Sequence, residues 1–228
     1  MEFEKDADTN LELVNAYATG TKEGPLSARG VGQARCVAGV LDARRPQALY
    51  SSAFIRARQT AEETERVLGI PVRVIKDFGE VNVGRLDPQH IPRQAVTLKA
   101  IQNLHRVLPS LIGDELSKSL LEYLFILFYF RSWHGGRTVA GETLQGALSR
   151  IKAVFNEVTG WHSPAEKIAI FTHGYFIHLL ANHILDRWGA PARVISNPYI
   201  RNGSITCLVR TAGGRWKVKA YADAGHMP

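Results

Sequence analysis

The chain has 228 residues, of which 45% are hydrophobic and 21% charged, a composition typical of globular proteins rather than disordered chains. Its formal charge of +7 favours anionic partners. The basic residues are scattered and form no basic tract, so we expect an anion pocket on a basic surface and not a nucleic-acid interface. The length suits one α/β unit, and we expect residues 1–228 to form a single domain.

The sequence also predicts the compartment. The longest apolar run, LLEYLFILFYF at 120–130, contains Glu122 and is far shorter than the roughly 20 residues that cross a bilayer. Because the N-terminal MEFEKDADTN is acidic and polar, we expect no secretory signal. Cys36 and Cys207 are expected to be buried thiols, without the spacing of metal ligands. We therefore expect a cytoplasmic protein with no membrane span, no metal and no cofactor. The oligomeric state is left open, with a homodimer as one option.

The first third of the chain alternates between strands and helices. Residues 10–15 (NLELVN) predict a short strand. Ser27 is suited to cap a helix, because apolar residues recur after it at helical spacing: Val31, Ala34, Val37 and Leu41. Residues 47–52 predict a second strand.

A second helix is predicted over 55–68, with Glu62 and Arg66 spaced for an ion pair one turn apart. Gly69 ends this helix, and residues 71–75 (PVRVI) predict a third strand.

Residues 88–140 interrupt the alternation. Their pattern predicts helices over about 93–107 and about 110–131, broken near Pro109, and we expect them to cap the carboxyl edge of the sheet. One helical face carries four large apolar residues: Leu121, Leu124, Phe125 and Phe128. If this face looks inward, the pocket would suit a lipophilic ligand; a buried helix is the competing interpretation.

The last third returns to the alternation. An amphipathic helix is predicted after Glu142, with apolar residues at Leu144, Leu148, Ile151, Phe155 and Val158. Residues 167–172 (KIAIFT) predict a buried strand, and Gly174 opens a helix to about residue 187. Residues 204–210 and 215–221 predict an antiparallel hairpin. The whole pattern predicts a three-layer α/β/α fold with a mostly parallel sheet, whose ligands bind at the carboxyl ends of the strands.

Taken in order, the loop sequences resemble the histidine phosphatase (phosphoglycerate mutase-like) superfamily. LVNAYATG with GPLSARGVGQA resembles its first strand and catalytic loop, and YSSAFIRARQTAEET its serine- and RxxQTA-bearing block. FGEVNVG, GETL, IFTHGYFIHLL and DAGHMP resemble the later blocks. Each motif is weak alone, but together they span nearly the whole chain. The resemblance implies a phosphoglycerate mutase-like fold.

The resemblance also implies site residues. In that family a histidine after the first strand takes up a phosphoryl group, arginines and a second histidine hold it, and a carboxylate protonates the leaving oxygen. The motifs place the clamp arginine at Arg56, the acid at Glu80 and the second histidine at His173. The positions of the other arginine and of the nucleophile hold Asn15 and Ala16. Since an alanine methyl has no lone pair to attack phosphorus, this implies that ordinary phosphohistidine chemistry is lost.

Each candidate has a structural alternative. Arg56 is either an anion anchor or a surface helix residue, and Glu80 either an acid/base or a solvated loop carboxylate. His173, before Gly174 at a predicted helix N-terminus, is either a ligand contact or a core histidine. Asn15 and Tyr17 either hydrogen-bond a ligand or fill vacated space. Because Asn15 also departs from the family pattern, natural divergence is favoured over an engineered change at Ala16.

Three functions are compatible with this sequence. The first is non-phosphatase acid/base chemistry (isomerisation, cyclisation, elimination or hydrolysis) by Glu80 and His173 on an anionic or lipophilic small molecule. The second is a pseudoenzyme that binds a phosphorylated or otherwise anionic small molecule, as a regulator or partner subunit. These two rank nearly level. The third, a phosphatase in which Glu80 activates water directly, ranks well behind.

Overall fold

A computed structural model describes residues 24–86, 103–104, 107–113, 116–117, 120, 124, 128, 130–184 and 200–227. The chain divides into two compact units. The larger comprises Glu23–Val81 and Gln145–Pro228, and the smaller comprises Met1–Lys22 and Asn82–Leu144. The predicted strand at 10–15 lies outside the described residues.

The larger unit is built on a parallel sheet in the order β2-β1-β5. The three strands are β1 (Ala48–Ser51), β2 (Val72–Val74) and β5 (Ile168–Phe171), each inside a predicted strand. Leu49 at the centre of the sheet pairs with Val72 on one side and Ala169 on the other, and it is fully buried. The α/β fold class predicted from the sequence is confirmed.

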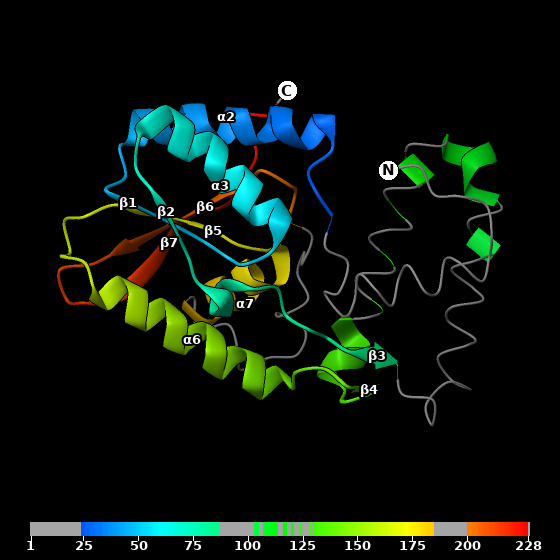
Figure 1. The fold of residues 1–228 in the computed structure, drawn as a ribbon. Helices are drawn as coiled ribbons and strands as arrows, with labels where there is room; N and C mark the ends of the chain where they lie inside the picture. Colours follow the sequence, from blue (N-terminus) through cyan, green and yellow to red (C-terminus); the bar gives the residue numbers. More distant parts are fainter. Residues whose placement is uncertain are drawn as a thin grey trace. The chain divides into compact units, whose positions relative to one another are not determined.

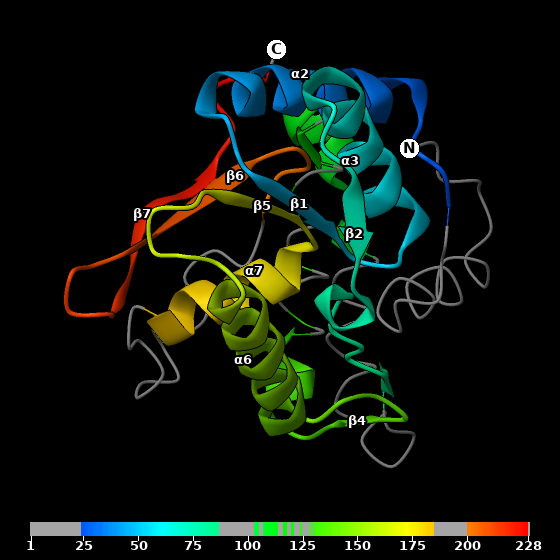
Figure 2. The ribbon, with the colours of Figure 1, turned by 60° about the vertical axis from the view of Figure 1, so that its left-hand side comes forward.

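Two helices cover one face of this sheet (Figures 1 and 2). Helix α2 (Ala28–Arg44) begins where predicted, because the Ser27 Oγ accepts a hydrogen bond from the N–H of Gly30 at 3.2 Å. Helix α3 (Ile55–Leu68) packs against α2 and ends at Gly69, whose φ of 69° is readily adopted by glycine. Both helices therefore match the sequence pattern.

The ion pair predicted between Glu62 and Arg66 is wrong. Arg66 instead meets Glu63, three residues before it, at 2.6 Å, and Glu62 lies 3.9 Å from Arg58. Residues three and four apart are both neighbours on a helix surface, so spacing alone does not decide between competing partners.

The other face of the sheet carries α6 (Leu144–Gly160) and α7 (Gly174–Ile184) (Figures 1 and 2). Four of the five apolar positions predicted for α6 are buried, at Leu148, Ile151, Phe155 and Val158. The described part of the chain thus has helices on both faces of a parallel sheet, which is the three-layer arrangement predicted.

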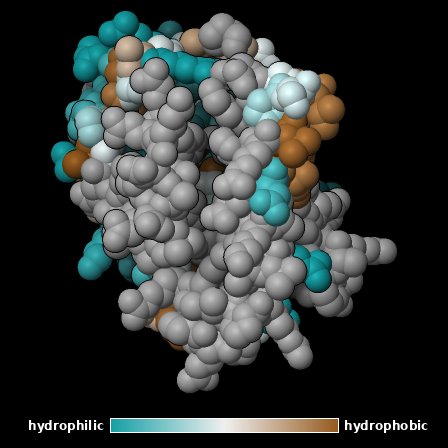
Figure 3. Space-filling model, turned by 90° about the vertical axis from the view of Figure 1, so that its right-hand side faces the viewer, coloured by the Kyte–Doolittle hydropathy of each residue, from teal (hydrophilic) through white to brown (hydrophobic). Residues whose placement is uncertain are grey.

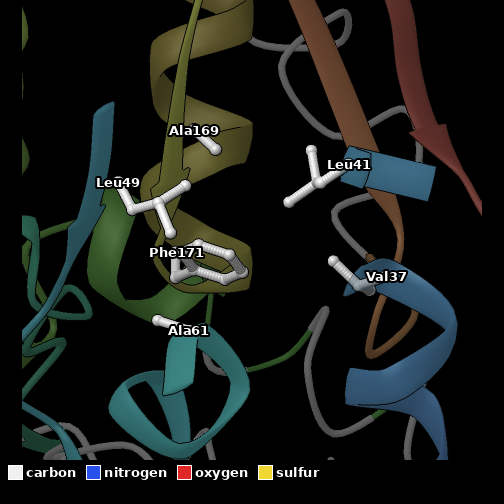
Figure 4. Close-up of a cluster of buried hydrophobic side chains, with 6 residues drawn as sticks. All are labelled: Val37, Leu41, Leu49, Ala61, Ala169 and Phe171. Carbon is white, nitrogen blue, oxygen red and sulfur yellow. The ribbon is translucent and has the colours of Figure 1, made fainter. Parts of the chain in front are cut away.

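One cluster of buried side chains joins the sheet to α2 and α3 (Figure 4). Its members come from α2, α3, β1 and β5: Val37, Leu41, Leu49, Ala61, Ala169 and Phe171. Burying a large apolar side chain contributes about 1.5–3 kcal/mol, so this cluster is a major source of the stability of the larger unit.

An antiparallel hairpin, β6 (Ile205–Arg210) with β7 (Trp216–Asp223), follows as predicted. Its turn is closed by a hydrogen bond from the N–H of Thr211 to the carbonyl of Arg215 at 2.8 Å. The Trp216 ring packs on Phe155 of α6 with centroids 5.0 Å apart, and β7 also contacts α7. The hairpin therefore belongs to the packing of the larger unit.

The smaller unit contains a two-stranded antiparallel ladder, β3 (Arg85–Leu86) with β4 (Thr138–Val139). Beside it the backbones approach so closely that a Cβ atom at Gly141 would collide with Asn82 and Gly84. The N–H of Glu142 donates to the carbonyl of Asn82 at 2.7 Å, and the Glu142 carboxylate accepts from the N–H of Asn82 at 3.1 Å. Glycine at 141 is what permits this approach.

The predicted cap, about 88–140, falls largely outside the described residues. The break expected near Pro109 is wrong, because residues 107–112 are helical and the helix ends at Gly113. Gly113 has φ 81°, and its N–H closes the last turn on the Pro109 carbonyl at 3.0 Å. Of the predicted apolar face, Leu121 and Phe125 lie outside the described residues, while Leu124 and Phe128 are half-buried.

Several large apolar side chains are exposed on the described residues of this segment: Leu104, Val107, Leu111, Ile112, Leu116 and Leu120. Figure 3 shows one face of the molecule, on which hydrophobic side chains (brown) lie beside hydrophilic ones (teal). Across the ranges that the structure describes, every helix is too short or too polar to cross a lipid bilayer.

Candidate functional site

The candidate site lies at the carboxyl ends of β1 and β5. Ser52 follows β1, and His173 lies two residues beyond the end of β5, directly before α7. The N–H of Ser52 donates to the Phe171 carbonyl at 2.9 Å, which aligns the two strand ends. Arg56 sits in the first turn of α3, which begins just after the same strand end. Parallel pairing therefore brings these three side chains together.

Both ring nitrogens of His173 are hydrogen-bonded. Nε2 lies 2.7 Å from the Ser52 Oγ, and Nδ1 lies 3.1 Å from Nη2 of Arg56. Because a guanidinium only donates, Nδ1 must accept, and the neutral ring therefore carries its proton on Nε2 and donates it to Ser52. A histidine that donates to a serine does not act as that serine's base, so the pair is not a nucleophilic dyad.

The His173 imidazole is held neutral. Burial lowers its pKa to about 3, with further lowering by the positive charges of Arg56 and Arg150. His173 is only 6% exposed, and Phe54 packs edge-on against its ring with centroids 4.9 Å apart. The Arg56 guanidinium lies over the Phe54 ring, 4.8 Å from its centroid. The arginine is therefore fixed in orientation by an aromatic face and a neutral histidine.

Glu80 enters from a third loop, two residues after the short 3₁₀ turn η1 (Lys76–Phe78). One carboxylate oxygen accepts from the N–H groups of Val81 at 2.9 Å and Phe176 at 3.2 Å. The other accepts from the N–H of Tyr175 at 3.3 Å. Tyr175 and Phe176 belong to the first turn of α7, so Glu80 acts as its N-terminal cap from a distant part of the chain.

Two opposed influences act on the Glu80 carboxyl. Burial raises its pKa, and the three backbone N–H groups and the charge of Arg56 work against that rise. The net direction is upward, as for a carboxyl group suited to act as an acid. Burial and the nearby Glu80 in turn raise the pKa of the Tyr175 hydroxyl.

Arg150 of α6 secures the loop that carries Glu80. Its Nη1 donates to the carbonyl of Asp77 at 2.6 Å and to that of Gly79 at 3.1 Å. The sequence analysis missed both Arg150 and Tyr175. No local pattern pointed to Arg150, since polar residues occur between the apolar positions of any amphipathic helix. Tyr175 adjoins the predicted His173–Gly174 pair, and that position was the available signal.

The structure brings together four predicted site residues: Arg56, Glu80, His173 and Gly174. Three others, Asn15, Ala16 and Tyr17, lie outside the described residues. Arg56 is half-buried and bonded to His173, so it is not a fully exposed surface arginine. His173 is buried with both ring nitrogens bonded to protein groups, which is also the arrangement of a core histidine, so its ligand contact stays a prediction. Glu80 is half-buried and bonded to α7, so it is not a solvated loop carboxylate.

A second histidine, His162, lies at the amino end of β5 and has different contacts. His162 lies between α6 and β5, and its Nε2 is 2.7 Å from the hydroxyl of the fully buried Tyr50. Its Nδ1 is 3.5 Å from a carboxylate oxygen of Glu166. The carboxylate also accepts from the N–H of Ser163 at 2.6 Å, and these contacts lower the pKa of Glu166.

His178 of α7 is fully buried. Its Nδ1 is 2.9 Å from the Tyr221 hydroxyl, and it also contacts Asn182 one turn along α7. Burial raises the pKa of Tyr221 to about 12. This cluster ties α7 to the hairpin.

Within the described residues, no group of three or more His, Cys, Asp or Glu side chains could hold a metal ion. The prediction that both cysteines are buried is wrong, because Cys36 and Cys207 are half-exposed and free. Cys36 lies beside the buried stripe of α2 rather than on it, since Ala34, Val37 and Leu41 carry that stripe.

The chain resembles solved structures along most of its length. Mycobacterial glucosyl-3-phosphoglycerate phosphatase in complex with VO3 is 20% identical, with a TM-score of 0.63, and the match covers 90% of each chain. Phosphoglycerate mutase from Bacillus anthracis is 18% identical with a TM-score of 0.59, covering 90% of this chain and 84% of that one.

A third structure is a histidine-to-alanine mutant of phosphoserine phosphatase from Entamoeba histolytica in complex with phosphoserine. It is 16% identical, with a TM-score of 0.61, covering 91% of this chain and 88% of that one. At such identities these likenesses establish the fold alone.

No curated protein sequence is significantly similar to the chain. The family model of the histidine phosphatase superfamily (branch 1), in contrast, matches residues 8–106 and 125–224. That match covers most of the sequence, and it agrees with the phosphoglycerate mutase-like structural neighbours. The chain therefore belongs to the histidine phosphatase superfamily.

Proposed function

We propose that the protein binds a small phosphorylated or otherwise anionic molecule at the carboxyl edge of β1 and β5, without forming a phosphohistidine. Arg56 is the anion anchor of this site, and His173 is a neutral orienting group. Asn15 and Tyr17, which the resemblance to the family's catalytic loop points to, are proposed as further hydrogen-bonding groups.

The contact between Arg56 and His173 carries the proposal. A histidine with a pKa near 3 neither takes up a proton nor gives one readily at neutral pH, so its value here lies in positioning. It accepts from the guanidinium at 3.1 Å, and the Phe54 ring packs against both the guanidinium and the imidazole. An arginine fixed in this way loses little conformational freedom when it pairs with an anion.

The absence of covalent chemistry rests on the correspondence of Ala16 with the family's nucleophile. An alanine at that position leaves nothing to accept a phosphoryl group. The histidine-to-alanine mutant of phosphoserine phosphatase that is complexed with phosphoserine supports the view that a protein of this fold keeps its ligand when a histidine is lost.

Calorimetric titration with inorganic phosphate and with phosphoserine tests the proposal. We expect Arg56→Gln to weaken binding at least about tenfold, because a charge-assisted hydrogen bond contributes about 1.5–3 kcal/mol. The matched control is Arg58→Gln, which removes the same charge from an exposed arginine two residues away that faces Glu62. It should leave the affinity within about twofold, as for an exposed ion pair.

Two results would contradict the proposal. One is equal affinity in wild type and Arg56→Gln, which would show that the anion binds elsewhere. The other is a labelled phosphoenzyme mapped to the loop around residue 16. The double variant Asn15→Arg with Ala16→His restores the arginine and histidine of the family pattern. If Asn15 and Ala16 occupy those two positions, this variant should gain some phosphatase activity.

A second candidate function, non-phosphatase acid/base chemistry, is supported by the raised pKa of Glu80. It predicts conversion of a metabolite that is lost in Glu80→Gln, whereas pure binding predicts no conversion in either protein. Turnover of an aryl phosphate that disappears in Glu80→Gln would instead indicate a phosphatase with Glu80-activated water.

A further inference from the structure

A cavity of about 310 Å³ lies against α2, and none of its lining residues belongs to the candidate site. Its walls are one face of α2, the loop before β6 and the C-terminal segment, lined by Arg29, Gly32, Gln33, Cys36, Arg201, Asn202 and Met227. Both ribbon views show the C-terminal segment (red) running beside α2 (Figures 1 and 2). The volume is that of a small-metabolite site.

The charged residues that line the cavity have one sign. Arg29 and Arg201 contribute two cations, and none of the seven described residues that line it is acidic. Among the residues that the structure describes, neither arginine takes part in an ion pair. Two like charges on the wall of one cavity repel each other, and an anion bound there would relieve the repulsion. The amides of Gln33 and Asn202 add hydrogen-bond donors at the same place.

The walls are held in place by the chain itself. The position of a Cβ atom at Gly203 is filled by the Met227 side chain, so the loop and the C-terminal segment are in direct contact. The His226 Nε2 donates to the Gly203 carbonyl at 2.9 Å. On the α2 side, a Cβ atom at Gly32 would meet nothing within 4 Å, which leaves this wall open.

We propose that this cavity binds a small carboxylate or phosphate anion, with Arg29 and Arg201 as its charge partners and the thiol of Cys36 in its wall. The site shares no residue with the Arg56–His173 site and goes beyond the proposed function. Its ligand is smaller than a peptide and carries at least one negative charge.

The Cys36 thiol reports on the site. In a Cys207→Ser background, the thiolate of Cys36 attacks a disulfide reagent, forms a mixed disulfide and releases a coloured thiolate. We compare the dianionic dithiobis(nitrobenzoate) with the uncharged dithiodipyridine. The ratio of the two rates should fall about tenfold in Arg29→Gln/Arg201→Gln, because the charges that concentrate the dianion are gone.

The matched control is Arg44→Gln/Arg210→Gln, which removes two exposed arginines of the same unit outside the cavity. It gives the same net charge and should keep the wild-type ratio. An equal fall of the ratio in both double variants would mean that only overall charge matters, and it would overturn the proposal.

Protection experiments identify the ligand class. Inorganic phosphate and malate are each titrated against the reaction of Cys36 with the uncharged reagent. Saturable protection by either one, lost in Arg29→Gln/Arg201→Gln, supports the site and assigns it to phosphates or carboxylates.

Gly32→Leu, which fills the cavity and keeps both arginines, should also abolish protection. No protection by either anion at millimolar concentration contradicts the proposal. Arg56→Gln should leave protection unchanged, so this test fails or succeeds independently of the proposed function.

Discussion

Two histidines at opposite edges of the same sheet have nearly the same first contact and opposite second contacts. His173 and His162 each place Nε2 2.7 Å from a hydroxyl, that of Ser52 or that of Tyr50. The second nitrogen then meets a cation, Arg56, in one case and the carboxylate of Glu166 in the other. The difference teaches that a shared hydroxyl contact does not fix the charge beside the second nitrogen. For His173, burial first and the charge of Arg56 second hold the ring neutral.

The largest expected difference between the two regions is in stability. His173→Ala should lower the free energy of unfolding by about 3 kcal/mol, because it opens a buried space and removes the partner of the enclosed Ser52 hydroxyl. His162→Ala should cost about 1 kcal/mol, since its side chain is partly exposed and water can replace it. Urea unfolding measures both. Equal losses would contradict the contrast between the two regions.

The next effect is in the pH dependence of stability. The pKa of His173 is about 3 in the folded protein and about 6.5 when unfolded, so between these values the unfolded chain binds a proton that the folded one does not. Stability is therefore lost as the pH falls through this window, by up to about 1.4 kcal/mol per pH unit. Glu80, with its raised pKa, acts in the opposite sense above its ordinary value.

The difference in the free energy of unfolding between wild type and a His173 variant, measured at each pH, separates the contribution of His173 from that of Glu80. His173→Gln should flatten the fall in stability between about pH 6.5 and pH 5, measured by urea unfolding at each pH. The control His162→Gln keeps the His173 contribution and should keep its slope. An unchanged slope in His173→Gln would mean that the ring is protonated in the folded state.

The smallest effect concerns the loop that Arg150 holds. Arg150→Gln removes both hydrogen bonds to the carbonyls of Asp77 and Gly79, and we expect roughly tenfold faster hydrogen exchange at the amides of Tyr175 and Phe176, which donate to Glu80. The amide of Ser163, which donates to Glu166 at the other edge, is an internal control and should not change. Uniform acceleration at all three would indicate a global loss of stability instead.

Much of the fold was predictable, because its signals are local. The cap at Ser27, the stop at Gly69 and the buried run before His173 each lie within one element, and the structure has all three where the sequence indicates them. Arg56, Glu80 and His173 were found through the resemblance of their loops to the family motifs, and parallel strands bring such loops to one end of the sheet.

What was missed depends on contacts between distant parts of the chain. The hydrogen bonds of Arg150 reach residues 73 and 71 positions away, and no local spacing announces them. Glu80 was predicted as an acid or a solvated carboxylate, but its bonds to α7 cross 95 and 96 positions. The pairing of Glu62 failed for the opposite reason, since several local partners compete for one carboxylate.

The bonds of Glu80 to the first turn of α7 have a consequence for any ligand. The chain supplies its own anion to these amides, tethered and present at one equivalent per molecule. A dissolved anion that approaches the same helix end must therefore displace this carboxylate or bind beside a like charge. The measured affinity for such an anion is therefore reduced by the free energy of displacing or facing the Glu80 carboxylate. Protonation of Glu80 removes this opposing charge and increases the affinity, although the ligand itself does not change.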